Sequence, residues 1–157
     1  MAVEFNRKNF LEYVSGILPQ YGFDFTTLKE AQENLLFDFI SGHDCVGVLP
    51  TNYGKSLIFQ LMPGVIKHFN PEIDPIIIVV TPINALIADQ IKRCDEIGLT
   101  AVHLTQENYD IIKQGHFSML FASPECLLNE KYREFLLSLS PRVTGIVIDE
   151  VHVVVKW

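Results

Sequence analysis

The amino-acid sequence predicts an α/β fold in which a parallel β-sheet is sandwiched between α-helices. Short, β-branched apolar runs alternate along the chain with longer segments of helical periodicity, which is the pattern of successive βαβ units. Turn-forming or charged pairs follow the apolar runs: Pro50-Thr51, Thr81-Pro82, Ser123-Pro124 and Asp149-Glu150. Because ligands of parallel sheets bind at the carboxyl ends of the strands, we expect the functional residues at these positions.

Two amphipathic helices are predicted before the first strand. Residues 9–18 place their apolar side chains on one helical face, and Pro19 ends that element. Residues 28–40 repeat the pattern, and Gly42 ends it. Further helices are expected from about Lys55, over the segment before Gly98, near 108–113 and near 127–137.

Apolar runs predict the strands of the sheet. The run PIIIVVT at 75–81 is apolar almost throughout, as expected for a strand that is covered on both faces. The other predicted strands are DCVGVL at 44–49, AVHL at 101–104, SMLFAS at 118–123 and TGIVIDE at 144–150. The sheet is therefore expected to start with the run that leads into Gly54, Lys55 and Ser56.

Length and composition indicate one folded domain. The chain has 157 residues, of which 48% are hydrophobic, and its mean hydropathy of +0.22 excludes a disordered tail. Its net charge of −7 argues against a freestanding nucleic-acid clamp, which normally carries a basic excess. A domain that touches nucleic acid through a few backbone contacts, or that forms half of a larger cleft, is still compatible with this charge.

Cysteine usage and the N-terminal sequence bear on the compartment. Cys45, Cys94 and Cys126 form no CxxC pair and no zinc-ligand spacing, so we expect reduced thiols. Residues 1–10 mix charged, polar and apolar side chains, unlike a signal peptide, and no apolar run approaches the ~18 residues of a membrane span. These observations predict an intracellular protein of the nucleus or cytoplasm with no membrane partner.

The stretch LPTNYGKS at 49–56 has the residues of a phosphate-binding loop. Gly54 permits close backbone approach, Lys55 can reach the β- and γ-phosphates of a nucleotide, and Ser56 offers a hydroxyl to Mg²⁺. Asn52 is acceptable in such a loop because asparagine enters left-handed backbone conformations at low cost. Gly-Lys-Ser alone is a weak signal, but between a predicted strand and a predicted helix it indicates a nucleotide site.

Two carboxylates directly follow the last apolar run. Burial of Asp149 and Glu150 at a strand end is costly unless a cation compensates them. Asp149 is placed to hold Mg²⁺ through its water shell, and Glu150 is placed to orient a water that attacks the γ-phosphate. An acidic turn after a strand is the ordinary alternative. Together with the loop at 49–56, the pair favours a nucleotide site with Mg²⁺, and the resemblance described next implies that the nucleotide is ATP.

Taken together, these stretches resemble the motifs of superfamily 2 helicases. LPTNYGKS and IDEVH are similar to motifs I and II, and 79–90 and 121–128 resemble motifs Ia and Ib. The stretches FDFTTLKEAQ at 23–32 and SLIFQLMP at 56–63 resemble the RecQ branch specifically. The resemblance covers the chain from about Phe25 and implies a RecA-like P-loop NTPase fold. Residues 1–24 are then an N-terminal helical extension, and 25–157 the first RecA-like lobe.

The resemblance also implies roles for individual residues. Phe25 would stack on adenine, Lys29 would flank the base and Gln32 would contact its edge; the alternative is the amphipathic start of a surface helix. His152 would link the ATP site to the nucleic-acid side. Trp157 is either a DNA-coupling residue or a core aromatic. The nucleotide loop would comprise Pro50, Thr51, Asn52, Tyr53, Gly54, Lys55 and Ser56, and the nucleic-acid contacts Thr81, Pro82 and Ser123, for which turn chemistry is the ordinary alternative.

The function implied is the motor lobe of an ATP-dependent 3′→5′ DNA helicase. It would act on single-stranded or forked DNA together with a second RecA-like lobe that supplies an arginine finger, and it would hydrolyse ATP poorly alone. Two alternatives are open: a stand-alone nucleotide-binding or interaction module, and a lobe of a DExH RNA helicase. Asn52 and Tyr53 depart from the usual glycine-rich pair, and either unchanged or impaired turnover is compatible with them.

Overall fold

The computed structural model describes residues 3–151, and the chain divides into two compact units, Met1–Ile73 and Asp74–Trp157. The first unit is helical and the second contains the β-sheet.

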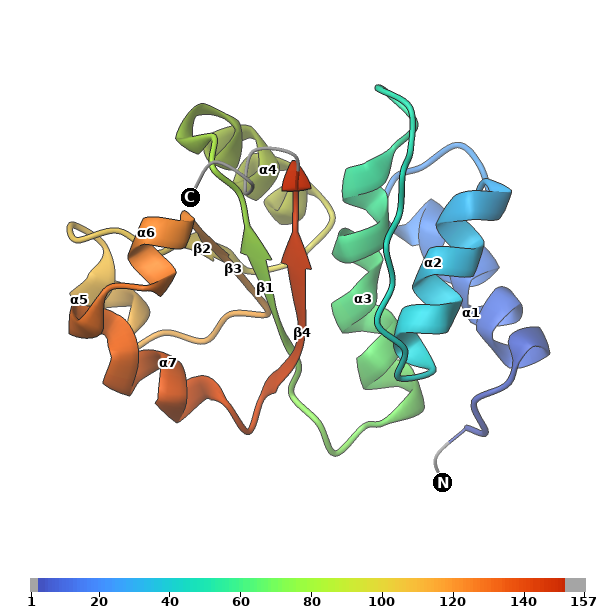
Figure 1. The fold of residues 1–157 in the computed structure, drawn as a ribbon. Coiled ribbons are helices and arrows are strands. Elements are labelled where there is room, and N and C mark those ends of the chain that lie inside the picture. The colour runs from blue at the N-terminus through green and yellow to red at the C-terminus, as the bar shows by residue number, and fades with distance from the viewer. Residues whose placement is uncertain (1–2, 152–157) are drawn as a thin grey trace. The chain divides into compact units, whose positions relative to one another are not determined.

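The first unit consists of three helices and an extended segment. These helices are α1 (Arg7–Gln20), α2 (Glu30–Ile40) and α3 (Lys55–Phe69), and α3 packs against both of the others (Figure 1). Their apolar stripes meet in a core with the fully buried side chains Phe10, Leu18, Leu36, Leu61 and Val65. Helix α1 begins where the Asn6 side chain accepts a hydrogen bond from the Asn9 amide at 3.0 Å. The helices predicted from periodicity over 9–18, over 28–40 and from Lys55 are confirmed, but the prediction that Pro19 ends the first of them is wrong, because α1 continues through Pro19 to Gln20.

The second unit is a four-stranded parallel sheet with helices between its strands. Its strands are β1 (Ile76–Val80), β2 (Ala101–His103), β3 (Met119–Ala122) and β4 (Val143–Ile148), in the order β2-β3-β1-β4. Its helical elements are α4 (Asn84–Glu96), α5 (Tyr109–Ile112), α6 (Pro124–Leu127), the 3₁₀ turn η1 (Glu130–Tyr132) and α7 (Arg133–Leu139). Strands at 75–81, 101–104, 118–123 and 144–150 are thereby confirmed within a residue or two.

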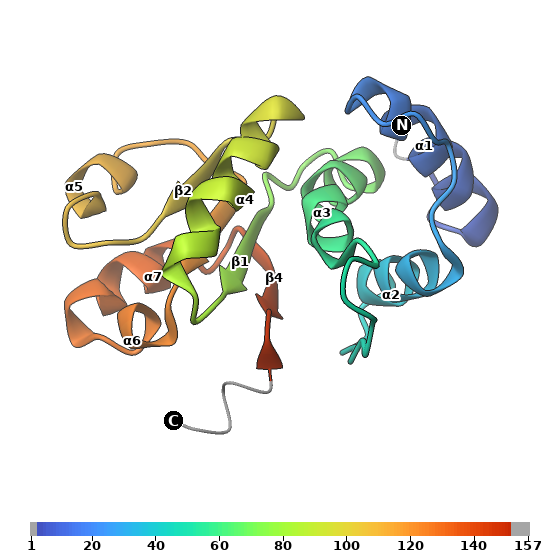
Figure 2. The same cartoon turned by 90° about the horizontal axis from the view of Figure 1, so that it is seen from above.

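Helices cover both faces of this sheet. Alternate residues of β1, starting with Ile76, share a buried cluster with side chains of α5, η1 and α7. The intervening residues of the strands point to the opposite face, which α4 covers. On that face the sulfur of Met119 in β3 lies 3.6 Å from the sulfur of Cys94 in α4. In both views α4 lies apart from the group formed by α5, α6 and α7 (Figures 1 and 2). The predicted α/β class, with a parallel sheet between helices, is therefore confirmed.

The strand predicted at 44–49 is absent. Residues 43–50 are extended but belong to no strand, and Val46 and Val48 are 88% and 92% exposed. An apolar run forms a strand only where a neighbour completes its backbone hydrogen bonds, and none of the described ladders includes this segment. Gly47 in this segment packs closely against α2: a Cβ added to Gly47 would lie 2.6 Å from a methyl carbon of Leu35.

The single helix predicted near 127–137 is also wrong. The chain there forms α6, η1 and α7 in succession. Asn129 interrupts the helix because its side chain accepts a hydrogen bond from the Lys131 amide at 2.9 Å and so starts a new turn. Separately, none of the helices among residues 3–151 has the length and apolar content to cross a bilayer.

Candidate phosphate-binding loop and acidic strand end

The loop before α3 is a tight turn with two left-handed residues. The Tyr53 amide donates to the Pro50 carbonyl at 3.2 Å, which closes a four-residue turn. Asn52, the third residue of this turn, has φ 62°, and Gly54 has φ 94°. A turn of this kind requires positive φ at its third position, where glycine and asparagine are preferred. The expectation that Asn52 adopts a left-handed conformation is confirmed.

Gly54 is the N-cap of α3, so the loop leads directly into a helix N-terminus. Helix α3 is 15 residues long, and Lys55 and Ser56 are the first two residues of its first turn. The first amides of a helix lack partners within the helix, and together with the helix dipole they attract anions. Alternating left- and right-handed residues also turn successive amides toward one side, as in anion-binding nests. Residues 50–56 therefore share two features with phosphate-binding loops, left-handed residues and a position directly before a helix N-terminus.

The start of α2 is hydrogen-bonded to this loop. The Lys29 ammonium donates to the Tyr53 carbonyl at 3.0 Å, and Gln32 Nε2 donates to the carbonyls of Tyr53 and Gly54 at 3.2 and 3.0 Å. Gln32 Oε1 in turn accepts from the Lys29 amide at 3.0 Å. Gln32 is 3% exposed, whereas Lys29 is exposed. The structure thus brings Lys29 and Gln32, which were predicted from a stretch more than 20 residues earlier, to the loop.

Phe25, the third residue predicted beside them, has a different surrounding. Its ring packs against Phe23 with a centroid distance of 5.1 Å, and it is 39% exposed. An exposed aromatic face of this kind is available for stacking. Its role toward a base remains a prediction.

The second unit positions the two acids at the end of β4. The Asp149 amide donates to the Val80 carbonyl at 2.9 Å, which extends the β1–β4 pairing by one bond. Glu150 then has φ 55°, a left-handed conformation that is uncommon for glutamate, and its amide donates to Asp149 Oδ1 at 3.0 Å. Both residues are partly buried. The chain therefore turns sharply at the acids, and such backbone strain is typical of functional sites.

The residues predicted to contact nucleic acid lie at the ends of β1 and β3. Thr81 and Ser123 are 3% and 8% exposed, and Pro82 is partly buried. Ser123 Oγ accepts from the Cys126 amide at 3.3 Å and so caps α6, which is the turn chemistry expected of it. The Thr81 hydroxyl is buried and has no hydrogen-bond partner in the described part of the chain. His152 and Trp157 lie outside the described residues.

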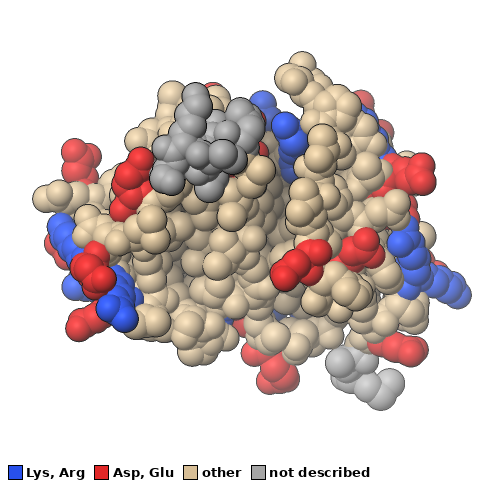
Figure 3. Space-filling model, in the orientation of Figure 1, with Lys and Arg blue, Asp and Glu red and all other residues tan. Residues whose placement is uncertain are grey.

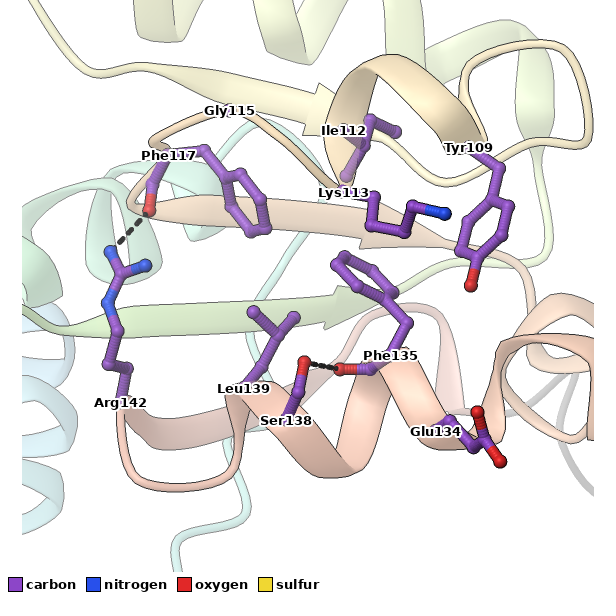
Figure 4. A pocket seen from close by; sticks show the side chains of 10 residues that line it. All are labelled: Tyr109, Ile112, Lys113, Gly115, Phe117, Glu134, Phe135, Ser138, Leu139 and Arg142. Atoms are coloured by element: carbon purple, nitrogen blue, oxygen red, sulfur yellow. Dashed lines mark hydrogen bonds between the residues drawn. The ribbon is translucent and has the colours of Figure 1, made fainter.

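A pocket on the second unit is lined by none of these residues. A pocket of about 390 Å³ between α5 and α7 is shown in Figure 4, with Lys113 beside Tyr109 at one end and Arg142 at the other. Arg142 already pairs with Asp74 at 2.6 Å and donates to the Phe117 carbonyl at 3.2 Å. On the face shown in Figure 3, acidic and basic side chains of the described residues are interspersed.

Two of the predicted site residues, one in each unit, carry oxygen atoms that could bind a magnesium ion. Among residues 3–151, no group of three or more His, Cys, Asp or Glu side chains gathers to hold a metal. Ser56 and Asp149 offer the oxygen donors that Mg²⁺ prefers, and both are partly buried. Mg²⁺ usually keeps several waters and is bound by one or two side chains plus substrate phosphates.

Sequence patterns did not indicate that the Tyr53 side chain contacts Lys29. The Lys29 ammonium lies 4.5 Å from the centroid of the Tyr53 ring. Tyr53 was predicted only as a member of the nucleotide loop. The two residues are far apart in the sequence and share no periodic pattern, so only the folded backbone reveals the contact.

A left-handed loop at a helix N-terminus and an acid pair after the parallel strand β4 are features of P-loop NTPases of the helicase type. The chain belongs to the DEAD/DEAH box helicase family, which matches residues 29–157.

The relatives of the chain are DNA helicases of the RecQ type. It is 31% identical over 142 residues to the probable ATP-dependent DNA helicase RecS of Bacillus subtilis. It is 34% identical over 145 residues to ATP-dependent DNA helicase Q-like 5 of Arabidopsis thaliana, and 30% identical over 146 residues to ATP-dependent DNA helicase RecQ of Synechocystis. These matches cover 86%, 87% and 87% of this chain but only 27%, 15% and 28% of the relatives. The resemblance to RecQ-like superfamily 2 helicases, in their RecA-like ATPase lobe, is confirmed.

Proposed function

We propose that the chain is the ATP-binding part of the first motor lobe of a RecQ-type DNA helicase. The observation that carries this proposal is the loop at 50–56, where Asn52 and Gly54 are left-handed and lead into the N-terminus of α3. Family membership supports ATP as the nucleotide, because the matched relatives are ATP-dependent DNA helicases.

Each predicted residue has a role that follows from its chemistry. Lys55 binds the β- and γ-phosphates, and the backbone amides of 53–56 surround them. Ser56 and Asp149 hold Mg²⁺, largely through water. When bound, this ion neutralises charge on the phosphates. Glu150 orients the attacking water and accepts its proton, as expected of a carboxylate next to the metal ligand.

Contacts with DNA are assigned to the ends of the second unit's strands. Thr81, Pro82 and Ser123 are proposed to meet the phosphate backbone of single-stranded or forked DNA. His152 is proposed to couple the ATP site to these residues, and Trp157 to contact the nucleic acid. A DNA substrate agrees with a protein that is located in the nucleus or the cytoplasm.

The chain spans less than a third of the length of each of these relatives. We propose that complete motor activity, with 3′→5′ movement, requires a second RecA-like lobe. That lobe would supply the charge that stabilises the transition state, so the present chain alone should hydrolyse ATP slowly.

Titration with a fluorescent ATP analogue and Mg²⁺ tests this function. We expect binding by the wild-type chain and a loss of at least about tenfold in Lys55→Ala, the size expected when a charged contact is removed. Lys8→Ala is a matched control, because Lys8 is exposed on α1 and faces Glu12 at 3.9 Å. Equal affinities of wild type and Lys55→Ala would overturn the assignment.

A strand-preference assay separates DNA from RNA. The proposal expects the complete protein to be stimulated by single-stranded DNA more than by RNA of the same sequence. Stronger stimulation by RNA would favour an RNA helicase instead.

A further inference from the structure

Lys29 contacts the side chain of Tyr53, and this contact depends on the aromatic residue that precedes Gly54 in the loop. The Lys29 ammonium donates to the Tyr53 carbonyl at 3.0 Å and also lies 4.5 Å from the centroid of the Tyr53 ring. An ammonium within about 6 Å of a ring centroid is attracted by the face of the ring. Tyr53 therefore holds Lys29 through its main chain and through its side chain.

These hydrogen bonds orient the backbone of the loop. In a trans peptide the C=O and the following N–H point in opposite directions. Because the Tyr53 carbonyl is turned toward Lys29 and Gln32, the Gly54 amide points to the other side. The Gly54 carbonyl is turned toward Gln32 in the same way, which turns the Lys55 amide away from α2.

A phosphate loop depends on this orientation. A carbonyl directed at an anion repels it, whereas an amide attracts it, so the peptide between Tyr53 and Gly54 must not flip when phosphate binds. Gly54 has no side chain to restrict its backbone, so the peptide before it has little conformational preference of its own. A cation that binds the Tyr53 carbonyl oxygen stabilises the peptide orientation in which the Gly54 amide points toward the phosphate.

We propose that Lys29 and Tyr53 form a positioning pair that fixes the Tyr53–Gly54 peptide for phosphate binding. The Tyr53 ring holds the Lys29 ammonium at the carbonyl, and Lys29 thereby serves the triphosphate rather than the base. This inference rests on the proposed nucleotide site and deepens it. The ligand class is a triphosphate group with or without a nucleoside.

Comparison of two ligands tests the pair. The dissociation constants of Mg-ATP and of inorganic triphosphate with Mg²⁺ are measured by calorimetry for wild type and for Lys29→Met, which keeps the apolar stem. We expect both ligands to weaken by the same factor, about tenfold, as for loss of one charge-assisted hydrogen bond. A loss for Mg-ATP alone would make Lys29 a contact of the base or sugar and overturn the proposal, as would no loss at all.

Variants of the ring test whether Lys29 acts through Tyr53. Tyr53→Leu, which removes the aromatic face, should weaken both ligands, and Tyr53→Phe, which retains that face, should weaken them less than Tyr53→Leu does. The double variant Lys29→Met/Tyr53→Leu should be no weaker than Lys29→Met, because the ring has no function without the cation. Fully additive losses would show that the two residues act separately and would contradict the pair. Lys29→Arg should restore binding, since a guanidinium also binds a carbonyl and an aromatic face.

A readout without ligand separates positioning from direct charge attraction. In the free protein, Lys29→Met should shift the amide resonance of Gly54, whereas Lys67→Met should not. Lys67 is a matched control because its ammonium also donates to two carbonyls, those of Pro71 at 2.7 Å and Ile73 at 3.0 Å. An unchanged Gly54 resonance in Lys29→Met would overturn the positioning role. If the wild-type chain binds neither ligand, the proposed nucleotide site fails, whatever the variants do.

Discussion

Gln32 and Gly54 lie so close together that no side chain fits between them. Gln32 Nε2 donates to the Gly54 carbonyl at 3.0 Å, and a Cβ added to Gly54 would lie 2.6 Å from the same nitrogen. Gly54 also has φ 94°, which residues with a side chain rarely adopt. The contact ties the first turn of α2 to the start of α3. The left-handed φ favours glycine at this position, and a side chain there would also displace the Gln32 amide.

Replacement of Gly54 by alanine should therefore damage both stability and nucleotide binding. We expect Gly54→Ala to lower the free energy of unfolding by about 1–3 kcal/mol, because of the left-handed backbone and the displaced Gln32 amide. Gly16→Ala is the control: Gly16 lies inside α1 with nothing within 4 Å of an added Cβ, so alanine should stabilise by about 0.5–1 kcal/mol. Urea unfolding of both variants checks this, and similar changes in the two would contradict the close contact.

The buried hydroxyl of Thr81 leads to a second prediction. Because this hydroxyl has no partner among the described residues, Thr81→Val should leave the free energy of unfolding unchanged or raise it, by up to about 1–3 kcal/mol. Thr81→Ala should lower it, since a cavity replaces the methyl group. Chemical denaturation measures both. A valine variant clearly less stable than wild type would show that the hydroxyl is hydrogen-bonded in the folded protein.

Cys45 and Cys94 should react with thiol reagents at very different rates. Cys45 is exposed in the extended segment 43–50. Partial desolvation and the charges of Asp38 and Asp44 raise the pKa of its thiol. Burial raises the pKa of Cys94 to about 12, so Cys94 should stay protected at pH 8 until the protein unfolds. Mass spectrometry after brief maleimide treatment measures the order. Protection of Cys45 equal to that of Cys94 would mean that the extended segment is covered after all.

His103 should make the protein less stable in mild acid. Burial lowers the pKa of this side chain below its ordinary value of 6.5, so the unfolded chain binds a proton there more readily than the folded protein. The loss of stability caused by His103 is absent above about pH 6.5. It grows as the pH falls below this value and is complete below the pKa of His103 in the folded protein. Replacement by glutamine should make the loss of stability toward pH 5 smaller. Thermal unfolding from pH 8 to 5 tests this, and identical pH dependence in both proteins would exclude His103 as a cause.

Much of the fold follows from local patterns. The continuous apolar run at 76–80 predicts a strand covered on both faces, and every residue of β1 is buried. Capping and breaking residues place α1, α2 and α3 closely, because they act within a few residues of each helix end.

What the sequence could not reveal depends on distant partners. The run 44–49 has the composition of a strand, yet a strand also needs a neighbour, and local composition does not tell whether one is present. Likewise, Gly-Lys-Ser identified the loop, but the bonds from Lys29 and Gln32 to Tyr53 join segments 21 to 24 residues apart. Spacing within a motif contains no information on such contacts.

The central claim is that residues 52–56 bind the phosphates of a nucleotide, and amide NMR during a titration with Mg-ATP tests it most directly. The resonances of Gly54, Lys55 and Ser56 should shift most, because their amides lie at the loop and at the N-terminus of α3. The same titration of Lys55→Ala should require a much higher nucleotide concentration. Shifts confined to residues outside the loop and α2, or no shifts in the wild-type chain, would contradict the account.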